Sequence, residues 1–473
     1  MSKNKKGFPF FIVFGAIVIL LGLSIVPWGK LTGNRIKDFN LLSDLFPGTV
    51  TNVATESIDP ELAKAMAEEN AADVMREEDD SLKIVRSVIV EGRDSISLHE
   101  VIDPKEASPN IGADGTVLIE DYTVSGKGLK NMKRAIKDVK KRPVRIAVIG
   151  DSYIEGDILT MNIREMLQDR YGGSGVGYMP ASSELTGFRT TVRQSCSGWT
   201  KHEIRQNMRA DTRILPGEYF TSQGGKSTYK GVSTLNNLDA WNSTTVLALA
   251  KSGGNIVLTT DSVSETLNLE PTDSVQALTI TDPTTMASIK ASYGVEILGM
   301  FLNDSIGICV DNMSLRGNSG QTHRKLSAQR AAQMRPFVDY DLIVVEYGIN
   351  ALSSQQKDYS AYKKLIMQTI SRLRECYPDA DILVMGIGDR GQKSGSVVKS
   401  VPTSSFMVDA QRDAARQTGV LFWDTRQAMG GEDAVLEWRA NGLINPDYIH
   451  LNHKGGKALA ELFVKALVAE IEN

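Results

Sequence analysis

A serine in a short polar turn is the first residue of this sequence whose setting suggests chemistry. The β-branched run 144–149 predicts a buried strand, Gly150 interrupts it, and Asp151 and Ser152 follow directly. Apolar residues at helical spacing resume from about residue 157, so Ser152 is expected in a strand-to-helix turn. At the carboxyl end of a parallel strand, such a turn exposes a side chain and points backbone N–H groups at an anion. Ser152 is therefore a candidate nucleophile, although Asp and Ser also favour plain turns and helix N-caps.

A serine nucleophile needs a base and a carboxylate that orients the base. Among five histidines, His450 stands out because Asp447 precedes it by three residues, just before a helix expected from about residue 455. In a helix-like turn, residues three apart face the same way, so Asp447 is expected to reach the imidazole and hold its tautomer. Ser152, His450 and Asp447 are thus predicted to form a catalytic triad.

The motifs around these residues resemble the four blocks of the SGNH, or GDSL-type, hydrolase family. Gly150-Asp151-Ser152 is similar to the nucleophile block, and the other blocks are matched by residues 312–317, 347–350 and 447–450. The resemblance covers roughly residues 128–205 and 306–473. It implies a serine esterase mechanism that requires no cofactor and no metal.

The resemblance also implies an oxyanion hole. Its donors are the N–H of Ser152, the N–H of Gly317 and the side-chain amide of Asn350, with Gly320 as an alternative to Gly317. The sequence departs from many members at Ala351, where they carry Asp, but it retains the Asn350 donor. The block residues Asp151, Tyr153, Gly320 and Gly348 are further candidates for contact with substrate.

Strands and helices alternate on both sides of a long interruption. Strands are expected at 306–310, 342–346, 382–385 and 420–423, and helices at 359–377 and 455–471. This alternation predicts an α/β fold, in which a parallel, flavodoxin-like sheet of the SGNH type is covered by helices on both faces.

The interruption lies between the first two blocks, where Ser152 and Gly317 are 165 positions apart. Between about residues 210 and 301, short strand-like runs alternate with Gly, Ser, Thr, Asp and Pro, which predicts an inserted all-β sandwich. With the N-terminal segment and the sequence G-D-S-Y-I-E-G-D, this insertion resembles the bacterial peptidoglycan O-acetylesterases, which carry a carbohydrate-binding-module-like sandwich there. Many of them have His where this chain has Tyr153. Trp199 and Trp241 are either sugar-stacking faces or core residues.

The N-terminus carries three lysines and then a mostly apolar run at 8–28, long enough to cross a hydrocarbon core of roughly 30 Å. We expect an uncleaved transmembrane anchor rather than a signal peptide, because no A-x-A cleavage site follows the run. The lysines would stay in the cytoplasm. The catalytic domain is then expected on the periplasmic or extracytoplasmic side of a bacterial inner membrane.

The expected organisation is an anchor (1–29), a tether with short strands (30–129), the hydrolase domain (130–209 and 305–473) and the insertion (210–304).

Charge and cysteine content exclude some classes of function. The 53 basic and 57 acidic residues are balanced and give no sign of nucleic-acid binding. Three scattered cysteines predict neither a disulfide framework nor a metal site.

The favoured function is a serine esterase that removes O-acetyl groups from a carbohydrate polymer, with peptidoglycan as the favoured substrate. The expected partners are an acetylated glycan and, through one N-terminal helix, a membrane. Three alternatives stay open: an O-acetyltransferase with the same triad, a lipase-like or thioesterase activity, and a tethered glycan-binding protein with a vestigial triad. Esterase action on another acetylated polysaccharide is also open.

Overall fold

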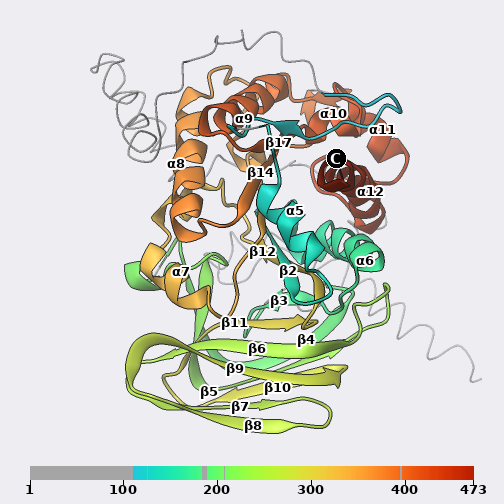
Figure 1. Ribbon diagram of the computed structural model, residues 1–473. Coiled ribbons are helices and arrows are strands. Elements are labelled where there is room, and N and C mark those ends of the chain that lie inside the picture. The colour runs from blue at the N-terminus through green and yellow to red at the C-terminus, as the bar shows by residue number, and fades with distance from the viewer. Residues whose placement is uncertain (1–109, 125, 184–188, 207, 395–396, 473) are drawn as a thin grey trace, which may run out of the picture. The chain divides into compact units, whose positions relative to one another are not determined.

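Five apolar segments pair side by side in parallel and form the central sheet (Figure 1). The structure, a computed structural model, describes residues 110–472 apart from 125, 184–188, 207 and 395–396. The parallel strands are β2 (Pro143–Gly150), β12 (Gly307–Ser314), β13 (Leu342–Glu346), β14 (Asp381–Met385) and β17 (Leu421–Trp423). Their order is β12-β2-β13-β14-β17, and the two-residue strand β1 (Glu120–Asp121) pairs antiparallel with β17 at one edge.

Helices cover both faces of this sheet, because each strand alternates apolar side chains between them. Ala147 and Ile149 share a buried cluster with residues of α7, α8 and α9, whereas Ile146 and Val148 share another with residues of α5, α6 and α12. The helices are α5 (Lys130–Lys137), α6 (Thr160–Tyr171), α7 (Ala328–Met334), α8 (Ser360–Cys376), α9 (Ser404–Thr418), α10 (Thr425–Met429), α11 (Ala434–Ala440) and α12 (His453–Glu472). The predicted α/β fold, with a parallel sheet covered by helices on both faces, is confirmed.

The strand order gathers three loops at one edge of the sheet. The first parallel strand, β2, lies between the second, β12, and the third, β13. Gly150 at the end of β2 is in register with Ser314 of β12 and Glu346 of β13. The chain reverses its direction of winding there, and at such switch points α/β sheets bind their ligands. The loops after β2, β12 and β13 carry Ser152, Gly317 and Asn350.

The insertion between α6 and β12 forms one nine-stranded antiparallel sheet. Its strands are β3 (Gly177–Met179), β4 (Val192–Glu203), β5 (Glu218–Gly231), β6 (Trp241–Ala250), β7 (Gly254–Thr259), β8 (Ser264–Leu269), β9 (Thr272–Thr284), β10 (Met286–Ala291) and β11 (Glu296–Asn303). The insertion is therefore all-β, while its description as a two-layer sandwich stays a prediction. Its sheet begins earlier than the expected boundary at 210, since β3 pairs with β11 and β4 pairs with β5. The sequence of β4 is mostly polar, so its hydrophobic pattern does not predict a strand.

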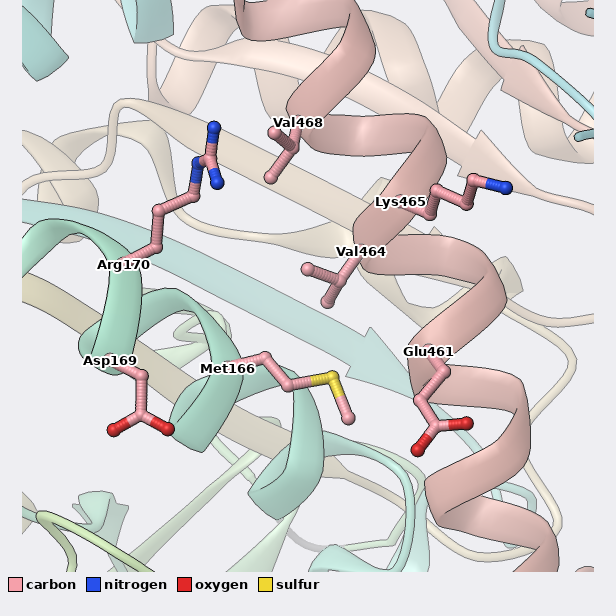
Figure 2. Close-up of a pocket in the computed structure, with 7 residues that line it drawn as sticks. All are labelled: Met166, Asp169, Arg170, Glu461, Val464, Lys465 and Val468. Carbon is pink, nitrogen blue, oxygen red and sulfur yellow. The ribbon is translucent and has the colours of Figure 1, made fainter.

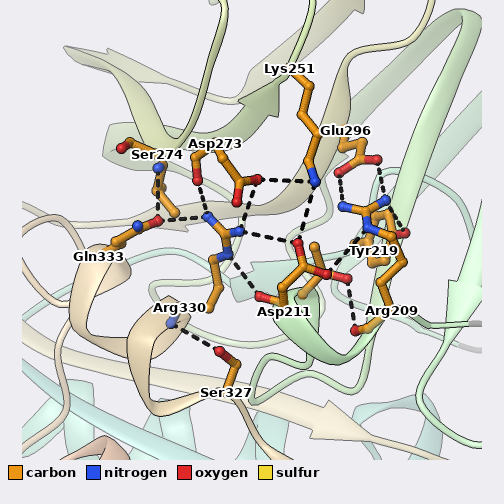
Figure 3. Close-up of polar contacts among 12 residues, drawn as sticks. Arg209, Asp211, Tyr219, Lys251, Asp273, Ser274, Glu296, Ser327, Arg330 and Gln333 are labelled. Atoms are coloured by element: carbon orange, nitrogen blue, oxygen red, sulfur yellow. Dashed lines mark hydrogen bonds and ion pairs between the residues drawn. The ribbon is translucent and has the colours of Figure 1, made fainter.

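The inserted sheet is fastened to the hydrolase domain by apolar packing and by charge. Residues of β6 and β11, among them Leu247 and Phe301, lie in the same buried cluster as α7 and α8. Figure 3 shows Arg330 of α7 among charged residues of the insertion. The Arg330 side chain, only 3% exposed, donates from Nε to the Asp211 carbonyl (3.1 Å) and from Nη2 to Asp273 Oδ1 (3.2 Å). Lys251 joins the same two aspartates.

A second buried ion cluster fixes the segment that follows the nucleophile. Asp157 has a left-handed backbone (φ 67°), and its carboxylate accepts from Arg164 Nη1 of α6 (2.7 Å) and Arg189 Nη2 (2.8 Å). Arg164 also donates from Nε to the Val310 carbonyl of β12 (2.7 Å). Burial favours a raised pKa for Asp157, but the two guanidinium groups outweigh burial and lower the pKa.

The predicted anchor at 8–28 and most of the predicted tether lie outside the described residues. None of the helices that the described residues form is both long and apolar enough to span a bilayer. Within the described part of the tether, Ile111 and Val117 form an isolated antiparallel bridge.

We expect Arg164→Met to lower the free energy of unfolding by about 3 kcal/mol, because it removes one of two buried partners of the Asp157 carboxylate. Urea denaturation followed by circular dichroism measures this loss. In the wild type, the Asp157 ion pairs contribute their full stabilisation at pH values above the ordinary pKa of aspartate. This stabilisation disappears as the pH falls through the lowered folded-state pKa of Asp157. Arg170→Met on the same helix removes an exposed ion pair with Glu472 and serves as the control that leaves stability almost unchanged. Equal destabilisation by both variants would contradict this account.

Candidate active site

The nucleophile loop leaves β2 through a position where only glycine fits. A Cβ on Gly150 would lie 2.8 Å from both the carbonyl oxygen and Oε2 of Glu346. The turn is then closed by Asp151 Oδ1, which accepts from the Tyr153 N–H (2.9 Å). Ser152 lies at the top of this turn with 9% of its surface exposed.

The structure brings Ser152, His450 and Asp447 together in one chain of hydrogen bonds. Ser152 Oγ lies 2.9 Å from His450 Nε2, and His450 Nδ1 lies 2.7 Å from Asp447 Oδ2. Because a carboxylate can only accept, Nδ1 carries the proton and Nε2 is left to accept from the serine hydroxyl. This arrangement can deprotonate Ser152 as it attacks a carbonyl carbon.

The loop that carries His450 and Asp447 is a tight reversal rather than a helical turn. An antiparallel bridge between Ile444 and Leu451 closes it, and Tyr448 at its tip has φ 60°. Asp447 Oδ1 accepts from the N–H groups of Ile449 (3.0 Å) and His450 (3.1 Å). Burial favours a raised pKa for Asp447, but the hydrogen bonds from the His450 ring and from these N–H groups lower it, so the carboxylate stays ionised.

Two backbone N–H groups in the loops around the serine have no acceptor within the described part of the chain. The Leu315 N–H donates to the Gly150 carbonyl (2.8 Å), which holds the loop after β12 against the nucleophile loop. Among the described residues, no group accepts from the N–H of Ser152 or Gly317. The Gly320 N–H, in contrast, donates to Asn318 Oδ1 (3.0 Å). The free N–H groups therefore favour Gly317 over Gly320 as the oxyanion donor.

The amide of Asn350 links the first and second loops. Asn350 lies in the short 3-10 helix η5 (Ile349–Ala351) and is 7% exposed. Its Nδ2 donates to Asp151 Oδ2 (2.9 Å) and to the Asn318 carbonyl (3.1 Å). Both amide protons are thus used in the free protein, so Asn350 must share or release one bond to donate to an oxyanion.

A pair of buried carboxyl groups lies beneath the site and was not predicted from the sequence. Glu346 at the end of β13 is 1% exposed, and its Oε2 has no hydrogen-bond partner among the described residues. Burial and, next, the charge of the neighbouring Asp151 raise the pKa of Glu346 well above its ordinary value. The apolar sequence of β13 could have indicated this buried glutamate, because it predicts a buried strand and Glu346 is the last residue of that strand.

The four residues predicted for substrate contact are all buried. Asp151 is fully buried, Tyr153 is 2% exposed with its hydroxyl near Met429 Sδ (3.7 Å), and Gly320 and Gly348 are buried. Their contact with substrate stays a prediction.

Of the two tryptophans, Trp241 is a core residue that is 2% exposed, with Nε1 donating to Thr244 Oγ1 (2.8 Å). Trp199 is half-buried and packs its ring over Gly225. The interior position of Trp241 follows from its place at the start of β6 in the sheet core.

Two arginines lie beside the loops that follow β12 and β13. Arg390 donates from Nη1 to the Ile349 carbonyl (3.0 Å). Arg205 comes from the insertion, and its Nη1 lies 3.1 Å from the place where a Cβ on Gly317 would be. Sequence reasoning missed Arg205, because its distance of 112 positions from Gly317 gives no sign of contact. Asp389, next to Arg390, is buried and accepts from Ser400 Oγ (2.6 Å), so it holds the fold together.

The shallow pocket in Figure 2 is a separate feature. Met166 and Arg170 of α6 and Glu461, Val464 and Val468 of α12 line it, together with Asp169 and Lys465. Glu461 is 11 positions beyond His450, more than two helical turns away along α12. This pocket contains none of the triad residues.

A central parallel sheet with a serine at its switch point, joined to histidine and aspartate, defines the α/β class of serine hydrolases. Comparison with known families agrees, because residues 297–458 match the GDSL-like lipase/acylhydrolase family. Residues 297–458 therefore resemble this family, and the predicted resemblance is confirmed.

Among solved structures, one titled as a peptidoglycan O-acetylesterase in action aligns with a TM-score of 0.61 and 23% identity, covering 75% of this chain and 99% of that one. This likeness supports the fold. A family two carbohydrate esterase from Cellvibrio japonicus aligns with a TM-score of 0.26 and 10% identity, over 59% of this chain and 99% of that one. No curated protein matches the chain in sequence.

We expect Asp447→Asn to lower kcat by about 10³- to 10⁴-fold with little change in KM, because the amide no longer fixes the productive His450 tautomer. Hydrolysis of p-nitrophenyl acetate under saturating substrate measures this loss. The matched control is Glu461→Gln, an exposed carboxylate of α12 outside the triad, which should keep the wild-type rate. A kcat within threefold of wild type in Asp447→Asn would exclude the aspartate from the triad.

Proposed function

We propose that this protein is a serine esterase that removes O-acetyl groups from a carbohydrate polymer, with O-acetylated peptidoglycan as its substrate. The observation that carries the proposal is the hydrogen-bonded chain from Ser152 through His450 to Asp447, together with the N–H groups of Ser152 and Gly317, which have no acceptor among the described residues. The GDSL-like family match supports hydrolysis of an ester. The structural likeness to a protein titled as a peptidoglycan O-acetylesterase, which extends over almost all of that chain, supports the choice of substrate.

The proposed reaction proceeds in two steps. The Ser152 hydroxyl attacks the acetyl carbonyl carbon while His450 Nε2 takes its proton, and the ionised Asp447 stabilises the imidazolium. The negative oxygen of the tetrahedral intermediate is held by the N–H groups of Ser152 and Gly317 and by Asn350, each donor being worth about 3 kcal/mol. The sugar oxygen leaves with the proton from His450. Water then repeats the sequence on the acetyl-enzyme and releases acetate.

We expect the purified protein to release acetate from O-acetylated peptidoglycan and Ser152→Ala to release none above background, because the variant lacks the nucleophile. Acetate is quantified enzymatically, with O-acetylated xylan and p-nitrophenyl acetate as comparison substrates. Turnover of O-acetylated xylan but not of O-acetylated peptidoglycan would show that the substrate is another polysaccharide. Transfer of acetyl groups to an added sugar in preference to water would replace the esterase with an acetyltransferase. Failure to hydrolyse any ester would exclude the catalytic proposal.

We also propose that the apolar run at 8–28 anchors the protein in a bacterial inner membrane with its catalytic domain outside the cytoplasm. The length of the run and the lysines that precede it support this placement. The full-length protein should sediment with membranes and resist extraction by alkaline carbonate, since a spanning helix is not released by loss of charge interactions. Release into the soluble fraction by carbonate would exclude a spanning anchor.

A further inference from the structure

Arg205 reaches from the insertion to the loop that supplies the oxyanion donor. It lies two residues after β4, the strand that pairs along its length with β5 of the antiparallel sheet. A Cβ added to Gly317 would lie 3.1 Å from Arg205 Nη1, so the guanidinium lies on the side of Gly317 where a side chain would project. Among the described residues, no group accepts from the N–H of Gly317. A residue of the insertion is therefore placed at the edge of the catalytic site.

One side of the Arg205 guanidinium is fixed and the other is unoccupied. Nε donates to Glu203 Oε1 (2.6 Å), and the Glu203 side chain is only 10% exposed. Within the described residues, neither Nη1 nor Nη2 has a hydrogen-bond partner. The Arg205 side chain is 28% exposed, and neither Nη atom is among the atoms sealed from solvent without a partner. The pair of Nη groups is thus held in one orientation and open to a ligand.

The charges around Arg205 leave it available to an anion. Glu203 is the carboxylate that faces it, and Glu203 also pairs with Lys201 Nζ (3.2 Å). Lys201 in turn pairs with Glu218 (3.0 Å), whose pKa is raised chiefly by burial. A single Glu203 charge is therefore shared between two cations. A guanidinium with both Nη groups free matches the two oxygens of a carboxylate, and this geometry distinguishes arginine from lysine.

We propose that Arg205 is a substrate-recognition residue that binds a carboxylate of the acetylated glycan and so places the acetyl ester over Ser152. This inference rests on the proposed esterase function and narrows its substrate to glycans that bear carboxylates. The peptide-substituted strands of peptidoglycan carry such groups, whereas a neutral backbone such as xylan does not. The insertion then contributes directly to specificity at the catalytic site.

The test combines one substitution with one chemical change of the substrate. O-acetylated peptidoglycan is compared with the same material after its free carboxyl groups have been converted to amides. For the wild-type protein, we expect amidation to lower kcat/KM by about tenfold to 100-fold, mainly through KM. Arg205→Gln should show a similar loss on the untreated material and no further loss on the amidated material. The kcat/KM of Arg205→Lys on the untreated material should lie between those of the wild type and Arg205→Gln, because lysine keeps the charge without the paired donors.

Two measurements separate recognition from a structural role. Hydrolysis of p-nitrophenyl acetate, which has no carboxylate, should change less than threefold in Arg205→Gln. Arg170→Gln, an exposed arginine that is also paired with a glutamate, should match wild type on every substrate. Equal losses by Arg205→Gln on untreated peptidoglycan, amidated peptidoglycan and the small ester would overturn the proposal, because Arg205 would then only support the Gly317 loop.

A binding measurement keeps this inference distinguishable from the proposed reaction. Soluble peptidoglycan fragments, untreated or amidated, are titrated calorimetrically into Ser152→Ala and into the double variant Ser152→Ala/Arg205→Gln. A preference for untreated fragments that disappears in the double variant supports Arg205 recognition even if no acetate is released by the wild type. Equal affinity for both fragment types in Ser152→Ala overturns the inference, even if the wild type proves to be an esterase.

Discussion

The close approach of three strand ends at Gly150 is the constraint on which the site depends. The Gly150 carbonyl accepts from the Leu315 N–H, and Glu346 fills the space that a side chain at position 150 would need. Any larger residue would push the nucleophile loop away from its two neighbours. Because the three strands are parallel and in register, this contact gathers Ser152, Gly317 and Asn350 on one edge of the sheet. The histidine loop completes the site from the far end of the chain.

The buried carboxyl groups near the site have pKa values shifted in opposite directions. Two guanidinium groups lower the pKa of Asp157, whereas burial and the Asp151 charge raise the pKa of Glu346. Asp447 is ionised because hydrogen bonds outweigh its burial. Of these three, Asp447 is the one that is hydrogen-bonded to the His450 ring. Asn350 links this buried layer to the surface, since its amide is bound to Asp151 in the free protein.

The insertion does more than extend the chain between two strands. Arg330 of the hydrolase domain is buried against two of its aspartates, and apolar residues of both sheets share one cluster. This packing makes the insertion a fixed neighbour of the catalytic edge. It explains how Arg205, from a loop after β4, lies against Gly317 with its orientation set by Glu203. A hydrolase site built on one domain thereby gains a side chain from another.

Local sequence determined the elements and the candidate triad. The predicted strand 342–346 has the same bounds as β13, and the predicted helix 359–377 differs from α8 by one residue at each end. The spacing of Asp447 and His450 predicted their contact, which is 2.7 Å long. These features depend on neighbours in the chain, whose periodicity and turn residues are visible in the sequence. The pairing of the polar edge strand β4 with β5, the burial of Glu346 beside Asp151 and the position of Arg205 near Gly317 depend on residues far apart along the chain. Only the tertiary structure decided them, because burial and long-range proximity leave no periodic pattern in the sequence.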